Sequence, residues 1–193
     1  MTIYSYVVHH DEGRRPNPYF KMCTLRGCKS RSSPGKNRNV EELAQKGDWV
    51  IGTGGAGKRS KGHGKLIYAM RVDETLTRET YFSDHRFARK KPVKTGTYVQ
   101  TRGDNEEPVT DFEKHEQFAL VSRYFWYFGA NAIDIPERFH LEKNFRGFHY
   151  VDPEHFRSFL EWLREEYKPG KHGEPCGKAA DELKGNKRCR SSC

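Results

Sequence analysis

The stretch from residue 11 to residue 35 carries the side chains best suited to chemistry. It is rich in Pro, Gly, Arg and Ser, and its polar or sulfur-bearing residues include Asp11, Asn17, Cys23, Cys28 and Lys29. The carboxylate of Asp11 can accept a proton, and the amide of Asn17 can donate to and accept from one edge of a base. Lys29 and Arg31 suit contacts with phosphate. A stretch this long and without periodicity is typical of a functional loop.

A structural explanation accounts for the same residues equally well. Asp11 suits an Asx-turn, and the prolines on either side of Asn17 restrict the backbone and fix a turn. The two cysteines are then small buried side chains. The polarity of the segment predicts an exposed position for Asn17. The residues alone leave the choice between a nucleotide pocket and a structural turn open.

An enzyme would need a reactive group with a partner. Asp11 and Cys23 are the candidates for such a group, but the sequence offers neither of them a clear catalytic partner, so the catalytic residues are unassigned. Four residues separate Cys23 from Cys28, whereas a zinc knuckle usually has two. The sequence therefore predicts no metal site and no cofactor.

A glycine-rich segment imitates a phosphate-binding P-loop. Residues 52–58 have the G-x-x-x-x-G-K spacing and follow an apolar strand. Arg59 stands where Mg²⁺ binding requires Ser or Thr, and glycines and another apolar strand follow in place of a helix. The segment is therefore predicted to be a basic hairpin loop and not part of a nucleoside triphosphatase. Its predicted phosphate contacts are Lys58, Arg59 and Lys61.

Further residues are candidates for nucleotide contacts, namely Trp49, Thr53, Gly54, Arg86 and Asn105. Aromatic residues that offer stacking surface are Trp49, Tyr68, Tyr124, Trp126 and Phe128. Base stacking is worth about 1–3 kcal/mol per base, but core packing is the commoner role of aromatic residues on strands. Alternation places Trp126 and Phe128 on one face of a strand and Tyr127 on the other, so only one set is free for a ligand. A salt-bridged turn explains Arg86 as well as a phosphate contact does.

The apolar pattern predicts how these residues are positioned. Strands are expected over residues 3–8, 48–53, 65–73, 96–100 and 117–128. Several strands with few helices imply an α+β domain around a curved sheet. Residues 1–168 are predicted to be a single domain. Residues 169–193, rich in Gly, Lys, Glu and Cys, are predicted to be a disordered basic tail.

Helix signals are fewer. Asn39 and Glu42 have capping-box spacing and begin a short helix over residues 39–45. Residues 75–82 are expected to form a short helix or turn, followed by a basic linker over residues 89–92. Asp152 as N-cap and the proline after it begin a helix whose apolar residues recur at helical spacing.

The composition favours a polyanionic partner. The 193 residues carry a formal net charge of +9, and residues 26–38 and 58–65 are basic blocks without an acid. Nucleic acid is the first expectation for such a chain, and 12 Phe, 10 Tyr and 3 Trp exclude wholesale disorder. No apolar run approaches the roughly 18 residues of a membrane span. A cytoplasmic location is therefore expected, and in that compartment five cysteines, an odd number, argue against a disulfide framework.

A series of motifs along residues 3–150 carries a family resemblance. They include Tyr4-Ser-Tyr-Val-Val8, Pro16-Asn17-Pro18, Cys23-Thr-Leu25, Gly47-Asp-Trp-Val-Ile-Gly-Thr-Gly54, Tyr68-Ala-Met-Arg-Val72, Asp84-x-Arg86-Phe87, Gly103-Asp-Asn105 and Tyr127-Phe-Gly129. In this order they resemble the nucleotide modification associated domain 2 family of phages and bacteria, which is assigned to DNA base hypermodification largely by genomic association. The resemblance implies a role around modified nucleotides and favours the pocket over the structural turn.

A second likeness concerns the fold. The order helix, strand, glycine-rich loop and strand, followed by Tyr81-Phe-Ser-Asp84, is similar to the PUA-like superfamily and its EVE-type members. These are small curved-sheet barrels that bind RNA or modified bases. The similarity implies an α+β fold with a PUA-like curved mixed sheet or barrel, a few short helices and a C-terminal amphipathic helix.

Two functions follow as hypotheses. The first is recognition of modified or flipped bases, or of nucleotides, in DNA within a phage or bacterial modification or defence system. The alternative is an enzyme that acts on a modified base or nucleotide, with residues 11–29 as its active site. A basic scaffold in a modification complex is a third. The expected partners are DNA or a nucleotide and the components of such a complex, and no membrane.

Overall fold

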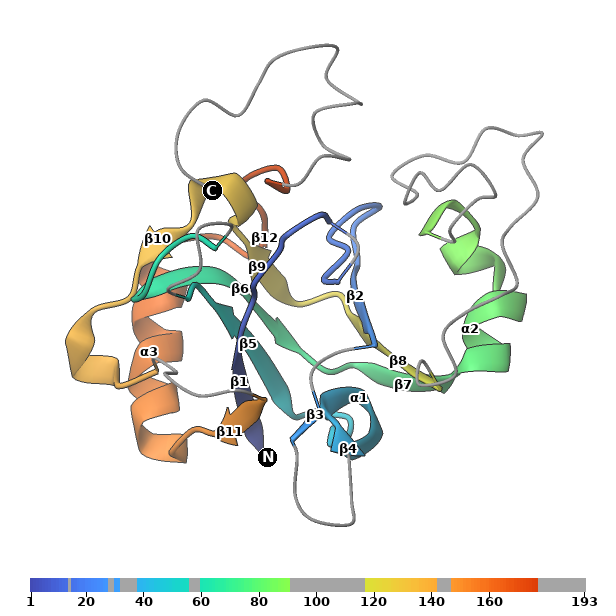
Figure 1. Cartoon of the computed structure of the whole chain (residues 1–193), viewed down its shortest axis with the longest axis horizontal. Coiled ribbons are helices and arrows are strands. Elements are labelled where there is room, and N and C mark those ends of the chain that lie inside the picture. The colour runs from blue at the N-terminus through green and yellow to red at the C-terminus, as the bar shows by residue number, and fades with distance from the viewer. Residues whose placement is uncertain are drawn as a thin grey trace.

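Strands dominate the fold. The computed structural model describes residues 1–13, 15–27, 30, 31, 38–55, 60–90, 117–141 and 147–176. Within these ranges the strands form a seven-stranded sheet, a three-stranded sheet and a two-stranded ribbon (Figure 1). The described residues form few helices beside these sheets, an arrangement compatible with the predicted α+β class.

The large sheet consists of β1 (Ile3–Val7), β5 (Trp49–Thr53), β6 (Lys65–Arg71), β9 (Phe125–Tyr127), β10 (Ile133–Asp134), β11 (Phe148–Tyr150) and β12 (Gly170–Lys171). Their order is β11-β1-β5-β6-β9-β12, and β10 pairs with β6. β1 runs parallel to β5 and β12 parallel to β9, whereas the other pairs are antiparallel. This order is open, so the strands that the structure describes form a sheet and not the closed barrel that was the alternative expectation.

One face of the large sheet is covered by α3 (Pro153–Glu166). The carboxylate of Asp152 accepts from the amides of Glu154 and His155, as expected of an N-cap. The buried stripe of the helix, Phe156, Phe159, Leu160 and Leu163, packs with a core cluster that includes Trp49, Ile51, Trp126 and Phe128. The predicted C-terminal amphipathic helix is therefore confirmed.

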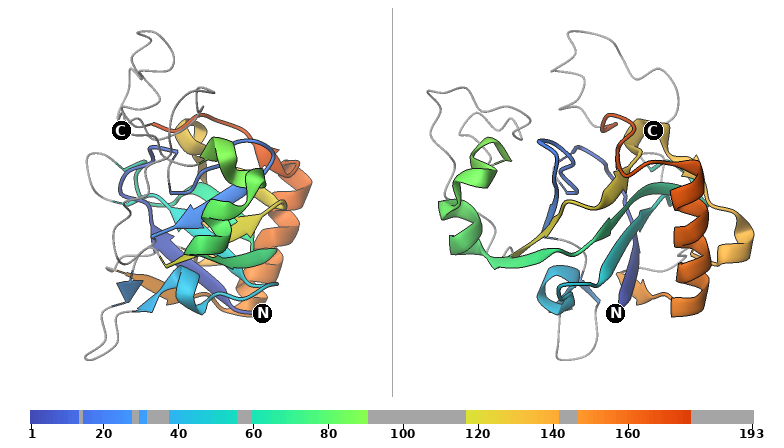
Figure 2. Two further views of the ribbon diagram at one scale, coloured as in Figure 1. Left: turned by 90° about the vertical axis from the view of Figure 1, so that its right-hand side faces the viewer. Right: turned by 180° about the vertical axis from the view of Figure 1, so that it is seen from behind.

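The opposite face of the sheet packs against the three-stranded sheet, whose order is β2 (Cys23–Arg26), β8 (Phe118–Ser122) and β7 (Glu74–Thr77). Its Leu25 and Leu120 belong to the same core cluster as Tyr6, Tyr68 and Tyr127 of the large sheet. α2 (Arg78–Ser83) and η1 (His85–Lys90) follow β7. Figure 2 shows α2 and α3 at opposite ends of the molecule.

The remaining elements are short. They are β3 (Ser30–Arg31), β4 (Arg38–Asn39), α1 (Val40–Leu43), η2 (Gly129–Asn131) and η3 (Glu137–Phe139). The predicted helix at residues 39–45 is present as the single turn α1. Its N-cap Asn39 makes no side-chain capping hydrogen bond, so the capping box was a wrong detail.

Two predicted elements differ from those observed. Residues 117–128 form two strands, β8 and β9, because the chain turns where the Ser122 hydroxyl bonds to both the amide and the carbonyl of Tyr124. Residues 75–82 begin in β7 and continue into α2, which Thr77 caps by accepting from the amide of Thr80. The strand predicted over residues 96–100 lies outside the described residues.

The folded part extends beyond residue 168. β12 pairs with β9, the amide of His172 donates to the carbonyl of Tyr127, and the amide of Cys176 donates to the carbonyl of Asp11. The first eight residues of the segment predicted as a tail therefore lie against the sheet. Residues 177–193 lie outside the described part. Among the helices of the described chain, none is long and apolar enough to cross a membrane.

Candidate functional site

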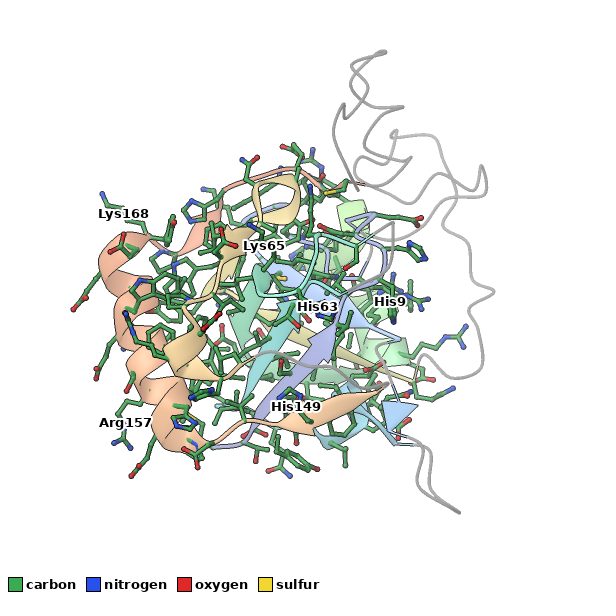
Figure 3. All side chains as sticks on the ribbon, turned by 60° about the vertical axis from the view of Figure 1, so that its left-hand side comes forward. His9, His63, Lys65, His149, Arg157 and Lys168 are labelled. Carbon is green, nitrogen blue, oxygen red and sulfur yellow. The ribbon has the colours of Figure 1, made fainter. Side chains whose placement is uncertain are left out.

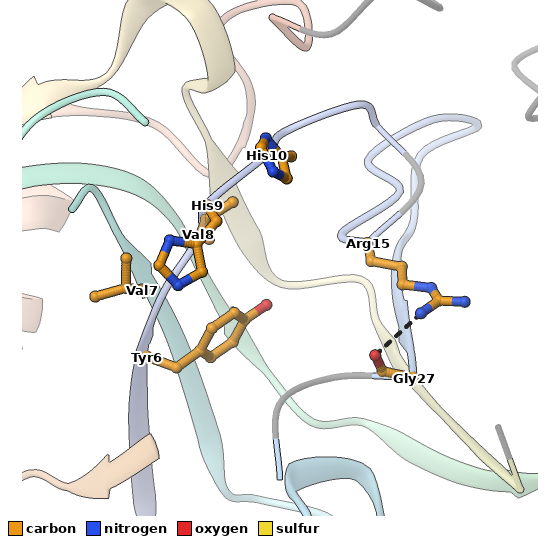
Figure 4. Close-up of a pocket in the computed structure, with 7 residues that line it drawn as sticks. All are labelled: Tyr6, Val7, Val8, His9, His10, Arg15 and Gly27. Atoms are coloured by element: carbon orange, nitrogen blue, oxygen red, sulfur yellow. Dashed lines mark hydrogen bonds between the residues drawn. The ribbon is translucent and has the colours of Figure 1, made fainter. Parts of the chain in front are cut away.

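A pocket of about 410 Å³ lies where β1 ends, beside the chain that leads to β2 (Figure 4). Its lining residues are Tyr6, Val7, Val8, His9, His10, Arg15 and Gly27. The tyrosine ring and the two valines provide an apolar wall. The imidazoles and the guanidinium provide hydrogen-bonding groups, and among the described residues that line the pocket there is no carboxylate. This combination suits a ligand with a flat apolar body and an acceptor-rich or anionic edge.

One wall of the pocket belongs to a hairpin formed by residues 15–27. The amides and carbonyls of Asn17 and Thr24 are paired at 2.9 and 3.0 Å. At the open end of the hairpin, Nη1 of Arg15 donates to the carbonyl of Gly27 at 3.2 Å. This bond holds the guanidinium beside the pocket, across from Tyr6 (Figure 4).

The other wall is fixed by a pair of tyrosines. The hydroxyls of Tyr6 on β1 and Tyr68 on β6 lie 2.6 Å apart, and their rings meet edge to face. Gly52 of the strand between them makes room for this pair, because a Cβ there would lie 2.2 Å from the Tyr68 ring. The glycine at the start of the apparent P-loop is therefore explained by packing. The antiparallel pairing of β5 with β6 confirms that the segment joins two strands.

Asp11 lies on the buried side of the loop that leaves β1. It is 5% exposed, and the Tyr127 hydroxyl approaches both carboxylate oxygens at 2.7 Å. The amide of Gly13 donates to the same carboxylate, which is the Asx-turn that the structural explanation required. Burial raises the pKa of Asp11 to about 6, although the bond from Tyr127 opposes the change.

Lys90 is bonded to both arms of the hairpin. Lys90 is 1% exposed, and its ammonium group donates to the backbone carbonyl and the amide oxygen of Asn17 and to the carbonyl of Met22. Burial lowers the pKa of Lys90 to about 7. The sequence placed Lys90 in a basic linker, and no local pattern marks it as buried.

Asn17 is buried, at 5% exposure, and so the expectation of an exposed side chain was wrong. Its amide oxygen accepts from Lys90 at 2.9 Å and from the amide of Tyr19 at 3.3 Å. Asn17 is buried because residues 15–27 fold back as a hairpin and η1 packs over that hairpin. The polarity of the segment is satisfied internally rather than by water.

Cys23 is also buried, in the core between the two sheets. Burial raises the pKa of its thiol to about 12, so the thiol is protonated at neutral pH. A protonated, enclosed thiol is a poor nucleophile. The small-buried-residue explanation of Cys23 is confirmed.

Other predicted site residues lie elsewhere. Arg86 donates to both carboxylate oxygens of Glu74, at 2.8 and 2.9 Å, and to Asp84, so it forms the salt-bridged turn that was the alternative. These bonds lower the pKa of Glu74 and raise that of Arg86. Trp49 is buried under α3 against Trp126 and Phe156.

The expected split of the aromatic residues is confirmed, but both faces of β9 are core. Trp126 and Phe128 pack towards α3, and Phe125 and Tyr127 pack towards the second sheet. Thr53 is buried and bonds to the carbonyl of Tyr6. Gly54 follows β5 and passes close to Gly62.

Of the basic residues predicted to contact phosphate, Lys61 is half-buried and close enough to Asp11 to oppose the rise in its pKa. Other predicted positions lie outside what the structure describes, namely Cys28, Lys29, Lys58, Arg59, Asn105 and the side chain of Arg31.

The pocket residues Tyr6, His9, His10 and Arg15 were not singled out from the sequence. The only signal was position, because polar residues directly after a strand often carry function. Figure 3 shows His9 and His63 on one side of the molecule and Arg157 on the α3 side. Within the described ranges, no group of three or more His, Cys, Asp or Glu residues is arranged to hold a metal ion.

Comparison with known proteins identifies a family. The family model described as nucleotide modification associated domain 2 matches residues 1–108 and 106–182. No curated protein matches the chain. No solved structure matches it either.

Proposed function

Because the chain belongs to the nucleotide modification associated domain 2 family, we propose that it binds a modified or flipped base of DNA, or the corresponding nucleotide, in the pocket at the end of β1. The observation that carries the proposal is the pocket itself. It joins an aromatic and aliphatic wall to a guanidinium and two imidazoles within about 410 Å³. That volume falls in the range of small-molecule sites, about 300–1,000 Å³.

The chemistry of the lining fits a nucleotide. The ring of Tyr6 and the side chain of Val8 offer apolar surface to a base, and Arg15 offers a planar fork of donors to a phosphate or to base acceptors. The net charge of +9 favours association with a polyanion. The proposal includes a cytoplasmic role in a phage or bacterial DNA modification or defence system. It also includes a PUA-like relationship, which rests on the order of α1, β5 and β6.

Binding measurements test the proposal. Wild-type protein is titrated with unmodified deoxynucleotides and with nucleotides from hypermodified DNA, free and within oligonucleotides. Arg15→Ala is expected to weaken the preferred ligand about tenfold or more, a loss of about 1.4 kcal/mol or greater. Arg157→Ala, on the exposed face of α3, removes the same charge far from the pocket and should change nothing. Equal affinities of the two variants would contradict the proposal.

A second candidate function, an enzyme acting on a modified base, has one observation in its favour. The pKa of Asp11 near 6 is suited to proton transfer at neutral pH. Incubation with modified nucleotides followed by mass spectrometry tests for turnover. Product formation that Asp11→Asn abolishes would support the enzyme, whereas binding without any product favours recognition.

A further inference from the structure

A second pocket, of about 400 Å³, lies at the turn of the 15–27 hairpin, at the end away from Arg15 and Gly27. Its walls come from the turn, from the start of β9 and from the segment around β12. The lining residues are Pro18, Tyr19, Phe20, Lys21, Arg123, Phe125, Pro169, Gly170 and Lys171. Of the lining residues that the structure describes, three are aromatic and three are cationic, and none carries a carboxylate.

The turn that carries three of these residues, Tyr19, Phe20 and Lys21, is strained. Phe20 and Lys21 have φ of 58° and 61°, and the amide of Met22 donates to the carbonyl of Tyr19. Positive φ at both central residues is typical of a type I′ turn, for which Asn-Gly is the favoured pair. A bulky aromatic residue in this conformation is unusual. Strain of this kind collects at functional sites, so a role for the Phe20 ring outside folding is indicated.

Cations accompany the aromatic rings of the turn. The guanidinium carbon of Arg89 lies 4.0 Å from the centre of the Phe20 ring, and Nζ of Lys171 lies 4.4 Å from that of Tyr19. Lys21 is exposed on the turn itself. Aromatic surface with interleaved cations is the arrangement with which proteins hold single-stranded nucleic acid.

The nearby carboxylates neutralise only part of the positive charge that lines the second pocket. Glu174 accepts from the Tyr19 hydroxyl at 3.0 Å and pairs with Lys171. Glu74 lies 3.8 Å from the Arg123 guanidinium, whose side chain is still 62% exposed. Lys21 and Arg123 are therefore the lining cations best placed to meet phosphates.

We infer that this second pocket holds a segment of single-stranded nucleic acid, with a base stacked at Phe20 and phosphates at Lys21 and Arg123. The inference rests on the proposed function, because one hairpin lines both pockets. The open end of the 15–27 hairpin lines the pocket at the end of β1, and its turn lines the second pocket. The base bound in the pocket at the end of β1 then belongs to a nucleic-acid strand that continues across the hairpin to the second pocket. The ligand is therefore a polynucleotide rather than a free nucleotide.

The test compares the affinity for a single-stranded oligonucleotide with the affinity for mononucleotides. The probes are thymidine monophosphate, a hypermodified pyrimidine mononucleotide, and a fluorescein-labelled oligodeoxythymidylate of about twelve nucleotides, within the site sizes of single-strand binders. Phe20→Asn removes the ring but suits the left-handed backbone. It is expected to weaken oligonucleotide binding about fivefold to a hundredfold and to leave mononucleotide binding unchanged. The melting temperature of the variant should equal or exceed that of wild-type protein.

Further variants separate a binding role from a structural one. Phe20→Tyr keeps the ring and should keep the wild-type affinity. Lys21→Asn should lower the salt slope of oligonucleotide binding by about 0.7, the value for one single-strand phosphate contact. Tyr150→Asn removes an aromatic side chain that is 51% exposed on β11 and should have no effect.

Two results would overturn the inference. One is oligonucleotide affinity that neither Phe20→Asn nor Lys21→Asn changes. The other is complete displacement of the oligonucleotide by polyglutamate at equal charge, which would identify an acidic peptide as the occupant. Failure of the proposed function has a different signature, because then neither mononucleotide would bind wild-type protein whatever the oligonucleotide does.

Discussion

The ammonium group of Lys90 donates to Asn17 twice, to the backbone carbonyl at 2.8 Å and to the side-chain amide oxygen at 2.9 Å. A third bond reaches the carbonyl of Met22, across the hairpin. One buried cation thus holds both arms of the 15–27 hairpin, whose two ends line the two pockets. Lys90 is not among the described lining residues of either pocket, but it is bonded to the hairpin that carries Arg15 and Phe20.

Lys90→Met should therefore destabilise the protein. It leaves buried carbonyl and amide oxygens without a donor, and we expect a loss of about 3 kcal/mol in the free energy of unfolding. Urea denaturation at pH 6, below the lowered pKa of Lys90 so that its ammonium group is charged, measures this loss. Lys46→Met, at an exposed position, is the control and should change the free energy by less than about 0.5 kcal/mol. Similar results for both variants would show that the Lys90 bonds do not stabilise the hairpin.

Substitutions of Asn17 separate positioning from base reading. Asn17→Ala removes the acceptor for Lys90 and should lower the free energy of unfolding by about 1–3 kcal/mol. Asn17→Asp keeps an oxygen acceptor for Lys90, replaces the amide donor with a second carboxylate oxygen and adds a negative charge. Because that charge pairs with the Lys90 ammonium group, we expect near wild-type stability and ligand affinity. Thermal melting and titration with the preferred ligand measure both. Normal stability of Asn17→Asp with lost affinity would instead show that the amide contacts the base.

Asp11 should make stability fall as the pH rises from about 4 to about 6. Its folded-state pKa, about 6, lies above the ordinary value of 3.8, so the folded state binds the proton more tightly than the unfolded state does. The resulting stabilisation is complete below about pH 4 and is lost as the pH rises through 6. Relative to Asp11→Asn, wild-type protein should lose about 3 kcal/mol of its free energy of unfolding between pH 4 and pH 6. Parallel curves for the two proteins in urea denaturation at several pH values would contradict the raised pKa.

The basic hairpin loop should contribute to the salt dependence of DNA binding. If Lys58, Arg59 and Lys61 each neutralise a phosphate, the triple change to Ala should reduce the slope of log affinity against log salt by about 2.7 on duplex DNA. The control is Arg157→Ala combined with Lys168→Ala, two exposed cations of the α3 side. An unchanged slope would exclude this loop from the interface.

The same loop should not support catalysis on nucleoside triphosphates. β5 is followed by the antiparallel β6, and none of the described loop residues, 54, 55 and 60–64, belongs to a helix that could present its amides to a phosphate. We expect no magnesium-dependent hydrolysis of ATP or GTP and no loss of stability in Lys58→Ala. Hydrolysis that this substitution abolishes would overturn the hairpin interpretation.

Local signals in the sequence determined several elements. Asp152 and Pro153 start α3 because a cap and a fixed φ act within one turn, and the apolar stripe of that helix defines its buried face. The alternation along β9 set which aromatic side chains share a face. The basic charge and the family motifs indicated nucleotides without needing the fold.

Only the tertiary structure decided where the pockets are. The contact between Asp11 and Tyr127 joins residues 116 positions apart, and that between Lys90 and Asn17 spans 73 positions, so no short-range pattern encodes either one. Lys90 is buried because η1 closes over the hairpin, although a lysine by itself favours water. Phe20 and Lys21 adopt left-handed turn positions against their own preference, because the bond from the Met22 amide to the Tyr19 carbonyl leaves only these two residues to close the hairpin. Long-range packing overrode local propensity at these residues, and they are the ones that shape both pockets.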